Sequence, residues 1–174
     1  QPPVPARGAV QGAAVRAAAR TYREAHEADI AREFAELLAI PNVASDSVNI
    51  RRNTAAVVEL LRRRGASARA LEGDGGPPAV YGELRTPGAA RTVVFYAHYD
   101  GQPVDPSQWT GAPFTPLFRD GSLAAGAKVI PAPVSGQRVD PESRIYARSA
   151  SDDKAAIIAM LGALDALRAA SIAP

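Results

Sequence analysis

Residues 91–101 constrain the fold of this chain most, and their sequence is Arg-Thr-Val-Val-Phe-Tyr-Ala-His-Tyr-Asp-Gly. Residues 92–97 are largely β-branched or aromatic, which predicts a buried β-strand. His98 and Asp100 follow at the end of this segment, and residues two apart on a strand face the same side. We therefore expect both side chains to project together from the edge of a sheet.

A histidine beside a carboxylate is a common arrangement in metal sites. The carboxylate binds one ring nitrogen, fixes the tautomer and directs the other nitrogen toward the metal. The alternative is a hydrogen-bonded histidine at a strand end, with Asp100 at the start of a turn. Residues 91–101 alone leave both interpretations open.

Length and composition exclude several other classes of function. The 174 residues are enough for one domain, or a large part of one. A net charge of +2 gives no electrostatic case for binding nucleic acid or an anionic membrane, and no segment is long and apolar enough to span a bilayer. The absence of cysteine excludes disulfides and thiolate metal sites. The start at Gln1 favours a periplasmic or secreted location over a cytoplasmic one if an export signal was removed; an artificial boundary is the other explanation.

The apolar pattern predicts an α/β fold in which a mixed β-sheet is flanked by helices. We expect helices over residues 9–39, 48–64 and 152–170. We expect strands over residues 66–71, 79–85, 92–97 and 144–147, with a Pro-Gly turn joining the second strand to the third. Residues 1–174 would form one unit, with an extended lead-in over residues 1–8 and an inserted loop over residues 121–143.

A second cluster of polar residues precedes the last predicted helix. Ser149 and Asp152 have the spacing of a capping box, and acidic residues are favoured in the first turn of a helix. However, Asp152 and Asp153 are adjacent and are followed by Lys154, one of only two lysines in the chain. This combination is unusual for a helix cap.

Taken in order, these and other motifs resemble the carnosinase-like dipeptidase branch of the zinc exopeptidases. The larger group includes aminoacylase, succinyl-diaminopimelate desuccinylase and the glutamate-releasing carboxypeptidases. The resemblance covers about residues 34–167 and corresponds to the N-terminal part of the catalytic domain. The motifs are Ala97-His98-Tyr99-Asp100, Gln102-Pro103-Val104-Asp105-Pro106, Trp109, Pro113-Phe114, Arg119-Asp120-Gly121 and Ser151-Asp152-Asp153-Lys154.

The resemblance implies a site with two zinc ions per complete enzyme. His98 would bind one zinc ion, Asp152 would bridge both, and Asp100 would be the catalytic residue that orients His98. The Asp152–Asp153 peptide bond would be cis. Imidazole nitrogen and carboxylate oxygen are suitable ligands for zinc, and a zinc pair would polarise the amide carbonyl that is cleaved.

The sequence departs from the family pattern at three places. Ala147-Arg148-Ser149 replaces a usual Gly-Arg-Gly, Ala155 replaces a glycine, and residues 121–143 replace a tight hairpin, which bears on substrate size and access. A Glu-Glu pair, a further acidic ligand and a second histidine are also expected in this family after the aspartate pair. We therefore expect the general base and the remaining ligands to lie outside this chain, together with any domain that forms a homodimer.

The predicted function is a metal-dependent hydrolase that cleaves amide bonds in small peptides or N-acyl amino acids. The 174-residue chain alone would be inactive because it lacks the base. The alternative is a non-catalytic binding or assembly domain that retains the fold. A serine hydrolase is a third hypothesis, because Ser149 and Ser151 lie at a strand-to-helix turn, but the chain has no Gly-x-Ser-x-Gly motif.

Overall fold

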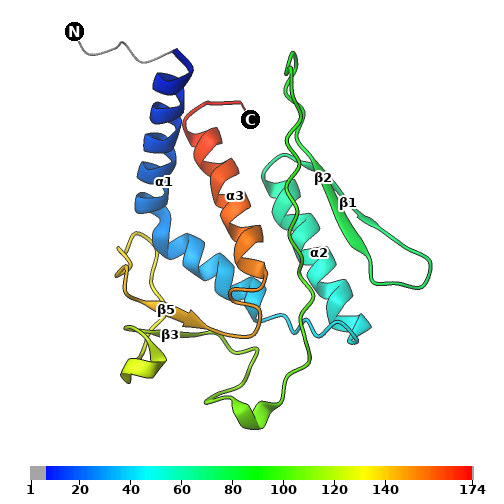
Figure 1. The fold of residues 1–174 in the computed structure, drawn as a ribbon, viewed down its shortest axis with the longest axis vertical. Helices are drawn as coiled ribbons and strands as arrows, with labels where there is room; N and C mark the ends of the chain where they lie inside the picture. The colour runs from blue at the N-terminus through cyan, green and yellow to red at the C-terminus, as the bar shows by residue number, and fades with distance from the viewer. Residues whose placement is uncertain (1–6, 174) are drawn as a thin grey trace.

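Three helices form one layer of the molecule (Figure 1). A computed structural model describes residues 7–173, and its helices are α1 (Arg7–Leu38), α2 (Ser47–Arg63) and α3 (Lys154–Ala169). In Figure 1, α3 lies between the other two helices. The three predicted helices are confirmed, with ends shifted by up to two residues. None of the helices in residues 7–173 combines the length and the apolar character needed to cross a membrane.

The hydrophobic core lies where the three helices meet. Apolar residues at helical spacing on α2 and α3 are buried there together with the last turn of α1. The buried members contributed by the helices are Leu37, Val57, Val58, Leu60, Leu61, Ile157, Ile158 and Leu161. Burial of such side chains stabilises the fold by about 1.5–3 kcal/mol each.

An ion-pair network joins the same helices beside this core. Arg64, directly after α2, places Nη2 2.7 Å from Glu33 Oε2 on α1 and 2.7 Å from Asp165 Oδ2 on α3. The Arg64 side chain is only 11 % exposed, so its two carboxylate partners offset the cost of removing the guanidinium from water. Gly65 follows with φ +85°, which is the left-handed conformation expected at a helix C-terminus.

The strands form two small antiparallel sheets. β1 (Ser67–Leu71) pairs with β2 (Ala79–Glu83), and this hairpin packs against α2. β3 (Leu117–Arg119) lies between β4 (Val129–Ile130) and β5 (Arg144–Tyr146). The α/β class is confirmed, but the described strands do not form the single mixed sheet that we expected. The parallel bridge Val43–Gly101 lies outside both sheets.

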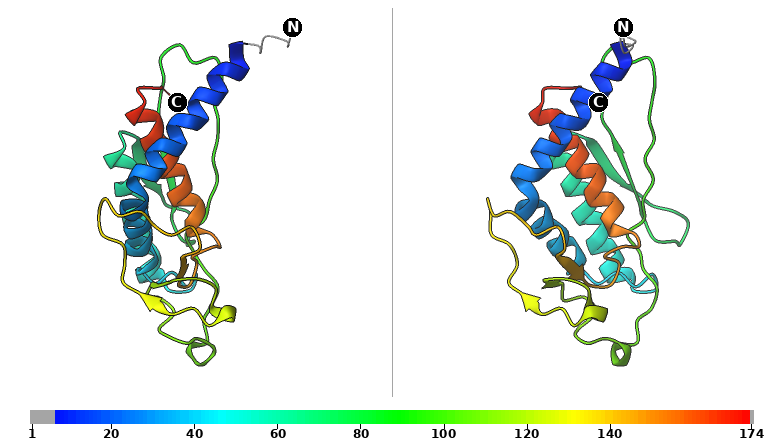
Figure 2. Two further views of the ribbon diagram at one scale, coloured as in Figure 1. Left: turned by 90° about the vertical axis from the view of Figure 1, so that its left-hand side faces the viewer. Right: turned by 60° about the vertical axis from the view of Figure 1, so that its left-hand side comes forward.

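The prediction of a buried strand over residues 92–97 is wrong. This segment is extended but has no strand beside it in the described part of the chain, and Figure 2 shows it running along one side of the helices. Val93, Val94, Phe95 and Tyr96 are 72 %, 84 %, 70 % and 87 % exposed. Strand propensity alone does not form a strand, because the backbone hydrogen bonds need a neighbouring strand.

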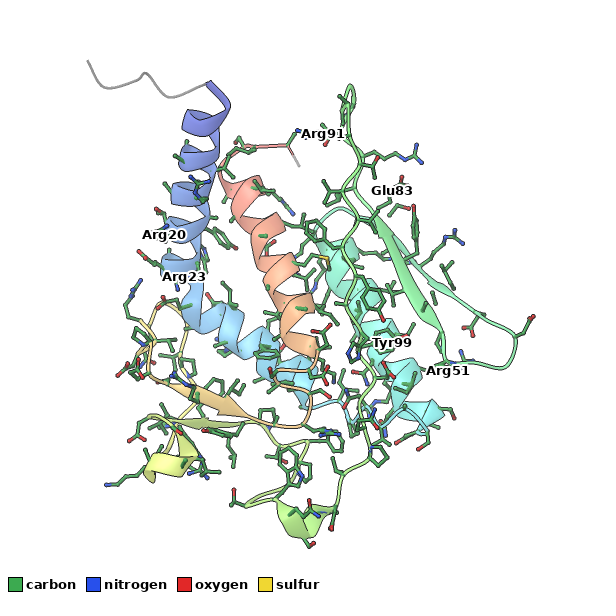
Figure 3. All side chains as sticks on the ribbon, in the orientation of Figure 1. Arg20, Arg23, Arg51, Glu83, Arg91 and Tyr99 are labelled. Carbon is green, nitrogen blue, oxygen red and sulfur yellow. The ribbon has the colours of Figure 1, made fainter. Side chains whose placement is uncertain are left out.

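The end of this extended segment is anchored. Tyr99 packs against the hydrophobic core, its hydroxyl donates a hydrogen bond to the Pro78 carbonyl, and it lies 2.9 Å from the Thr54 hydroxyl of α2. Figure 3 shows Tyr99 beside α2, with Arg91 at the far end of the segment. The chain is therefore held firmly at the position where His98 and Asp100 occur.

The inserted loop, residues 121–143, packs on α1. It contains β4 and a short 3₁₀ helix, η2 (Leu123–Ala125). Its contacts with α1 lie near residue 26, where the helix is kinked. Arg138 Nη1 donates to the Glu24 carbonyl at 2.9 Å, and the Val139 N–H donates to Glu27 Oε2 at 3.1 Å. The predicted lead-in falls mostly on residues outside the described part, and α1 already includes its last two residues, 7 and 8.

Lys154, the first residue of α3, is fully buried. Its Nζ donates to the Leu37 carbonyl at 2.8 Å and to the Ile40 carbonyl at 2.9 Å, at the C-terminal end of α1. Burial lowers the pKa of Lys154 to about 7. The carbonyl oxygens and the negative end of the α1 dipole favour the charged form. This side chain therefore fixes the start of α3 against the end of α1.

Lys154→Met should destabilise the protein, because it leaves two interior carbonyl groups without their donor. We expect a loss of about 2–3 kcal/mol in the free energy of unfolding, measured by urea denaturation. The matched control is Lys128→Met, because Lys128 is the other lysine and is exposed. Equal stability of the two variants would contradict the role of the buried ammonium group.

Phe95→Ser should change the free energy of unfolding of the 174-residue chain by no more than about 0.5 kcal/mol, because this side chain is exposed. Leu161→Ala is the contrasting variant, since Leu161 has 0 % exposure. It should cost about 2–5 kcal/mol. A loss of similar size for both variants would show that residues 92–97 are packed in solution.

Candidate metal site

His98 is the centre of the candidate site. Its Nε2 lies 3.0 Å from Asp152 Oδ1, although the two residues are 54 positions apart in the sequence. Its Nδ1 lies 3.1 Å from the Asp100 carbonyl oxygen and 3.3 Å from Asp100 Oδ1. The structure therefore brings together the three residues that the sequence singled out.

The turn before α3 presents the aspartate pair. The Asp152–Asp153 peptide bond is cis, as expected from the resemblance. Asp153 Oδ2 accepts a hydrogen bond from the His98 backbone N–H at 3.1 Å, so this second carboxylate joins the turn to the histidine segment. Because α3 begins only at Lys154, Ser149 and Asp152 do not form the capping box that was the alternative interpretation of this cluster. The Ser149 hydroxyl instead accepts a hydrogen bond from Asn42.

The site is open to solvent on one side. The side chains of His98, Asp100 and Asp152 are 37 %, 48 % and 85 % exposed. Burial lowers the pKa of His98. The hydrogen bond to Asp100 and the charges of Asp100 and Asp152 together outweigh this effect, so the pKa lies above its ordinary value. Both ring nitrogens face acceptor atoms, and a protonated imidazole satisfies both.

Comparison with known proteins finds curated relatives over about half of this chain. No family model matches the chain. The succinyl-diaminopimelate desuccinylase of Acidovorax ebreus (strain TPSY) is 37 % identical over 87 residues, which are 49 % of this chain and 17 % of that protein. The enzyme of the same name from Paracidovorax citrulli (strain AAC00-1) is 36 % identical over 86 residues, or 16 % of its length.

Two solved structures share the fold. Human carnosine dipeptidase 1 superimposes with a TM-score of 0.66 at 22 % identity, over 91 % of this chain. The di-peptidase Dug1p from Saccharomyces cerevisiae superimposes with a TM-score of 0.67 at 17 % identity, also over 91 % of this chain. The chain is therefore similar in sequence to desuccinylases over about half of its length and similar in fold to these two dipeptidases. It covers 32 % of each of these two dipeptidase chains.

The two donor atoms at the centre of the site fit the zinc chemistry that the sequence resemblance implies. Zinc–ligand bonds of about 2.0–2.2 Å in tetrahedral geometry place neighbouring ligand atoms about 3.3–3.5 Å apart. The 3.0 Å between His98 Nε2 and Asp152 Oδ1 is close to that separation. Within residues 7–173, however, no group of three or more histidine, cysteine, aspartate or glutamate side chains is placed to hold a metal ion.

The geometry gives no support to a serine hydrolase. Both ring nitrogens of His98 contact Asp100 or Asp152. Ser149 is buried, and its hydroxyl accepts from Asn42 rather than contacting the imidazole. A serine nucleophile needs a base within hydrogen-bond reach, and the ring is already engaged with the two aspartates.

Sequence analysis missed the structural roles of two residues at this site. Asp153 had only its adjacency to Asp152 as a signal, and its contact with the His98 backbone was not foreseen. Asn42 lies in the loop between α1 and α2, and no feature of the local sequence connects it to residues 98–100 or 149–153. A long-range contact of this kind becomes visible only in three dimensions.

Asp152→Asn should lower the pKa of His98, because the carboxylate that stabilises the charged imidazole becomes a neutral amide. The pKa is measured by NMR titration of the metal-free chain, in which His26 is the only other histidine. Asp74→Asn, an exposed aspartate of the β1–β2 turn, is the control and should leave the His98 titration unchanged. An unchanged midpoint in Asp152→Asn would show that the two side chains are apart in solution.

Proposed function

We propose that this chain is the N-terminal part of the catalytic domain of a zinc-dependent hydrolase. The enzyme cleaves amide bonds in small peptides or N-acyl amino acids. The names of the relatives support this substrate class, because a desuccinylase removes an acyl group from an amine and a dipeptidase cleaves a dipeptide. In this proposal, the general base and the remaining metal ligands come from polypeptide outside the chain.

The observation that carries the proposal is the contact of His98 Nε2 with Asp152 Oδ1 at 3.0 Å. It joins a nitrogen and an oxygen ligand from two distant segments within a fold shared with dipeptidases. A structural histidine would require only one acceptor, whereas this ring is held on one side by Asp100 and faces a mostly exposed carboxylate on the other. That is the arrangement of a ligand with its orienting group.

Each residue of the candidate site then has a distinct role. His98 Nε2 binds one zinc ion after losing its proton, and the Nδ1–H bonded to Asp100 fixes the tautomer and the plane of the ring. Asp152 has two carboxylate oxygens and would be the ligand shared by two zinc ions. When bound, the zinc pair polarises the scissile carbonyl and makes water more acidic. Asp153 holds the turn against the His98 backbone, so both ligands keep their relative position.

The second candidate function is a non-catalytic binding or assembly domain with the same fold. The observation that favours it is the lack of a third ligand near His98 and Asp152 in residues 7–173. Zinc content separates the two candidates when it is measured in a protein that contains this chain and the rest of the domain. Two zinc ions per chain support the hydrolase, and a protein that binds no zinc supports the binding domain.

His98→Ala and Asp152→Ala should each lower kcat/KM for a dipeptide or N-acyl amino acid at least about 1,000-fold in the complete protein, because each removes a metal ligand. Asp100→Asn should cost about 10–100-fold, because it disturbs only the orientation of His98. His26→Ala and Asp74→Ala are matched controls that replace the same residue types elsewhere and should leave kcat/KM unchanged. Full activity of His98→Ala or Asp152→Ala would rule out the assignment.

A further inference from the structure

Asn42 joins the two segments that carry the candidate ligands. Its side chain is fully buried. Its Nδ2 donates to the Tyr99 carbonyl at 2.7 Å, between His98 and Asp100 in the sequence. The same nitrogen donates to Ser149 Oγ at 2.8 Å, in the turn that leads to Asp152. Both amide hydrogens are therefore used, one on each side of the site.

The backbone of the same loop strengthens this link. The Gly101 N–H donates to the Asn42 carbonyl at 2.7 Å, and the Ala44 N–H donates to the Gly101 carbonyl at 2.9 Å. This bridge follows directly after Asp100. A Cβ atom at Gly101 would lie 2.7 Å from Ser149 Oγ and 3.1 Å from Asn42 Nδ2. The Asn42 loop, the histidine segment and the Ser149 turn therefore approach one another so closely at Gly101 that a side chain there would clash.

Ser149 has an unusual backbone at this junction. Its φ of +63° is in the left-handed region, which is unfavourable for a residue with a Cβ atom. Its carbonyl accepts from the Lys154 N–H at 3.2 Å, and its buried hydroxyl accepts from Asn42. The hydrogen bond to Asn42 is thus a specific reason for a serine at a position where glycine would be less strained.

We propose that Asn42 is a positioning residue, whose hydrogen bonds to Tyr99 and Ser149 set the distance between His98 and Asp152. The assignment of a metal to this pair rests on the proposed function, but the positioning itself does not. Asn42 touches neither substrate nor metal. It acts by holding the histidine segment and the aspartate turn in register. Groups that surround the ligands of a metal site commonly orient them in this way without binding the metal themselves.

A purely structural role for Asn42 predicts a different result, and the chain contains a suitable control. Asn53 is also fully buried, and its Nδ2 also donates to two carbonyl groups, those of Pro41 and Asn49, at 2.8 Å each. In both asparagines Oδ1 is buried and has no hydrogen-bond partner among residues 7–173. The hydrogen bonds of Asn53 reach neither the histidine segment nor the aspartate turn, so Asn53→Ala should reproduce the loss of stability without the loss of the link.

The experiment is long-range ¹H–¹⁵N NMR of the imidazole rings in the metal-free 174-residue chain, at one pH. Asn42→Ala should move the His98 ring-nitrogen signals through most of the shift that Asp152→Asn produces. Ser149→Ala, which removes only the hydroxyl, should move them in the same direction by less. The double variant should match Asn42→Ala, because both changes remove the same hydrogen bond. Asn53→Ala should lower Tm and leave the His98 signals in place.

His98 signals that stay in place in both Ser149→Ala and Asn42→Ala would overturn the proposal. If Asn42→Ala does not fold, Ser149→Ala decides the outcome alone. A shift of equal size in Asn53→Ala would also overturn it, since the effect would then follow from lost stability.

A second measurement uses the complete protein. There, Asn42→Ala should weaken zinc binding about 10–100-fold relative to Asn53→Ala. Zinc affinities that are equal in these two variants would contradict the positioning role. A wild-type protein that binds no zinc would overturn the proposed function, whereas the NMR result would still decide the role of Asn42.

Discussion

The buried ammonium group of Lys154 is the interaction on which the arrangement of the site depends. It spans from the first residue of α3 to the carbonyl groups at the end of α1. An uncompensated buried cation is costly, so these acceptors and the α1 dipole determine where α3 can begin. Since Asp152 and Asp153 immediately precede Lys154, their position follows from this contact. The side chain of Asn42, shortly after the end of α1, completes the junction on its other side.

The extended segment, residues 92–97, shows what a run of β-branched and aromatic residues can and cannot determine. Its β-branched and aromatic residues favour an extended backbone, and that is the conformation observed. A strand also requires a partner, and the described residues provide none on either side. The result is four consecutive large apolar side chains, residues 93–96, that are mostly exposed. Composition therefore predicted the backbone conformation correctly but not the burial, because burial depends on residues that are not local.

The candidate site was predictable where its chemistry is local. The two-residue alternation placed His98 and Asp100 on one side, and the adjacent aspartates before a helix pointed to Asp152. The alternative interpretation of Ser149 as a helix cap does not hold, because the chain makes a further turn before α3 begins and the Ser149 hydroxyl accepts from Asn42 instead. The helices were predicted well for a related reason, since the apolar spacing of each helix and its stop signals lie within its own sequence.

Under the proposed function, the geometry of the site has a consequence for metal binding. Two donors leave a tetrahedral zinc ion with half of its ligands missing, so the pair formed by His98 and Asp152 alone would bind the metal weakly. Tight zinc binding becomes possible only when the remaining ligands join the site. The buried contacts of Asn42 and Lys154 hold the two donors 3.0 Å apart before that happens. The folding of this chain therefore fixes two ligands in advance, and the conformational entropy that is lost when the metal binds is smaller.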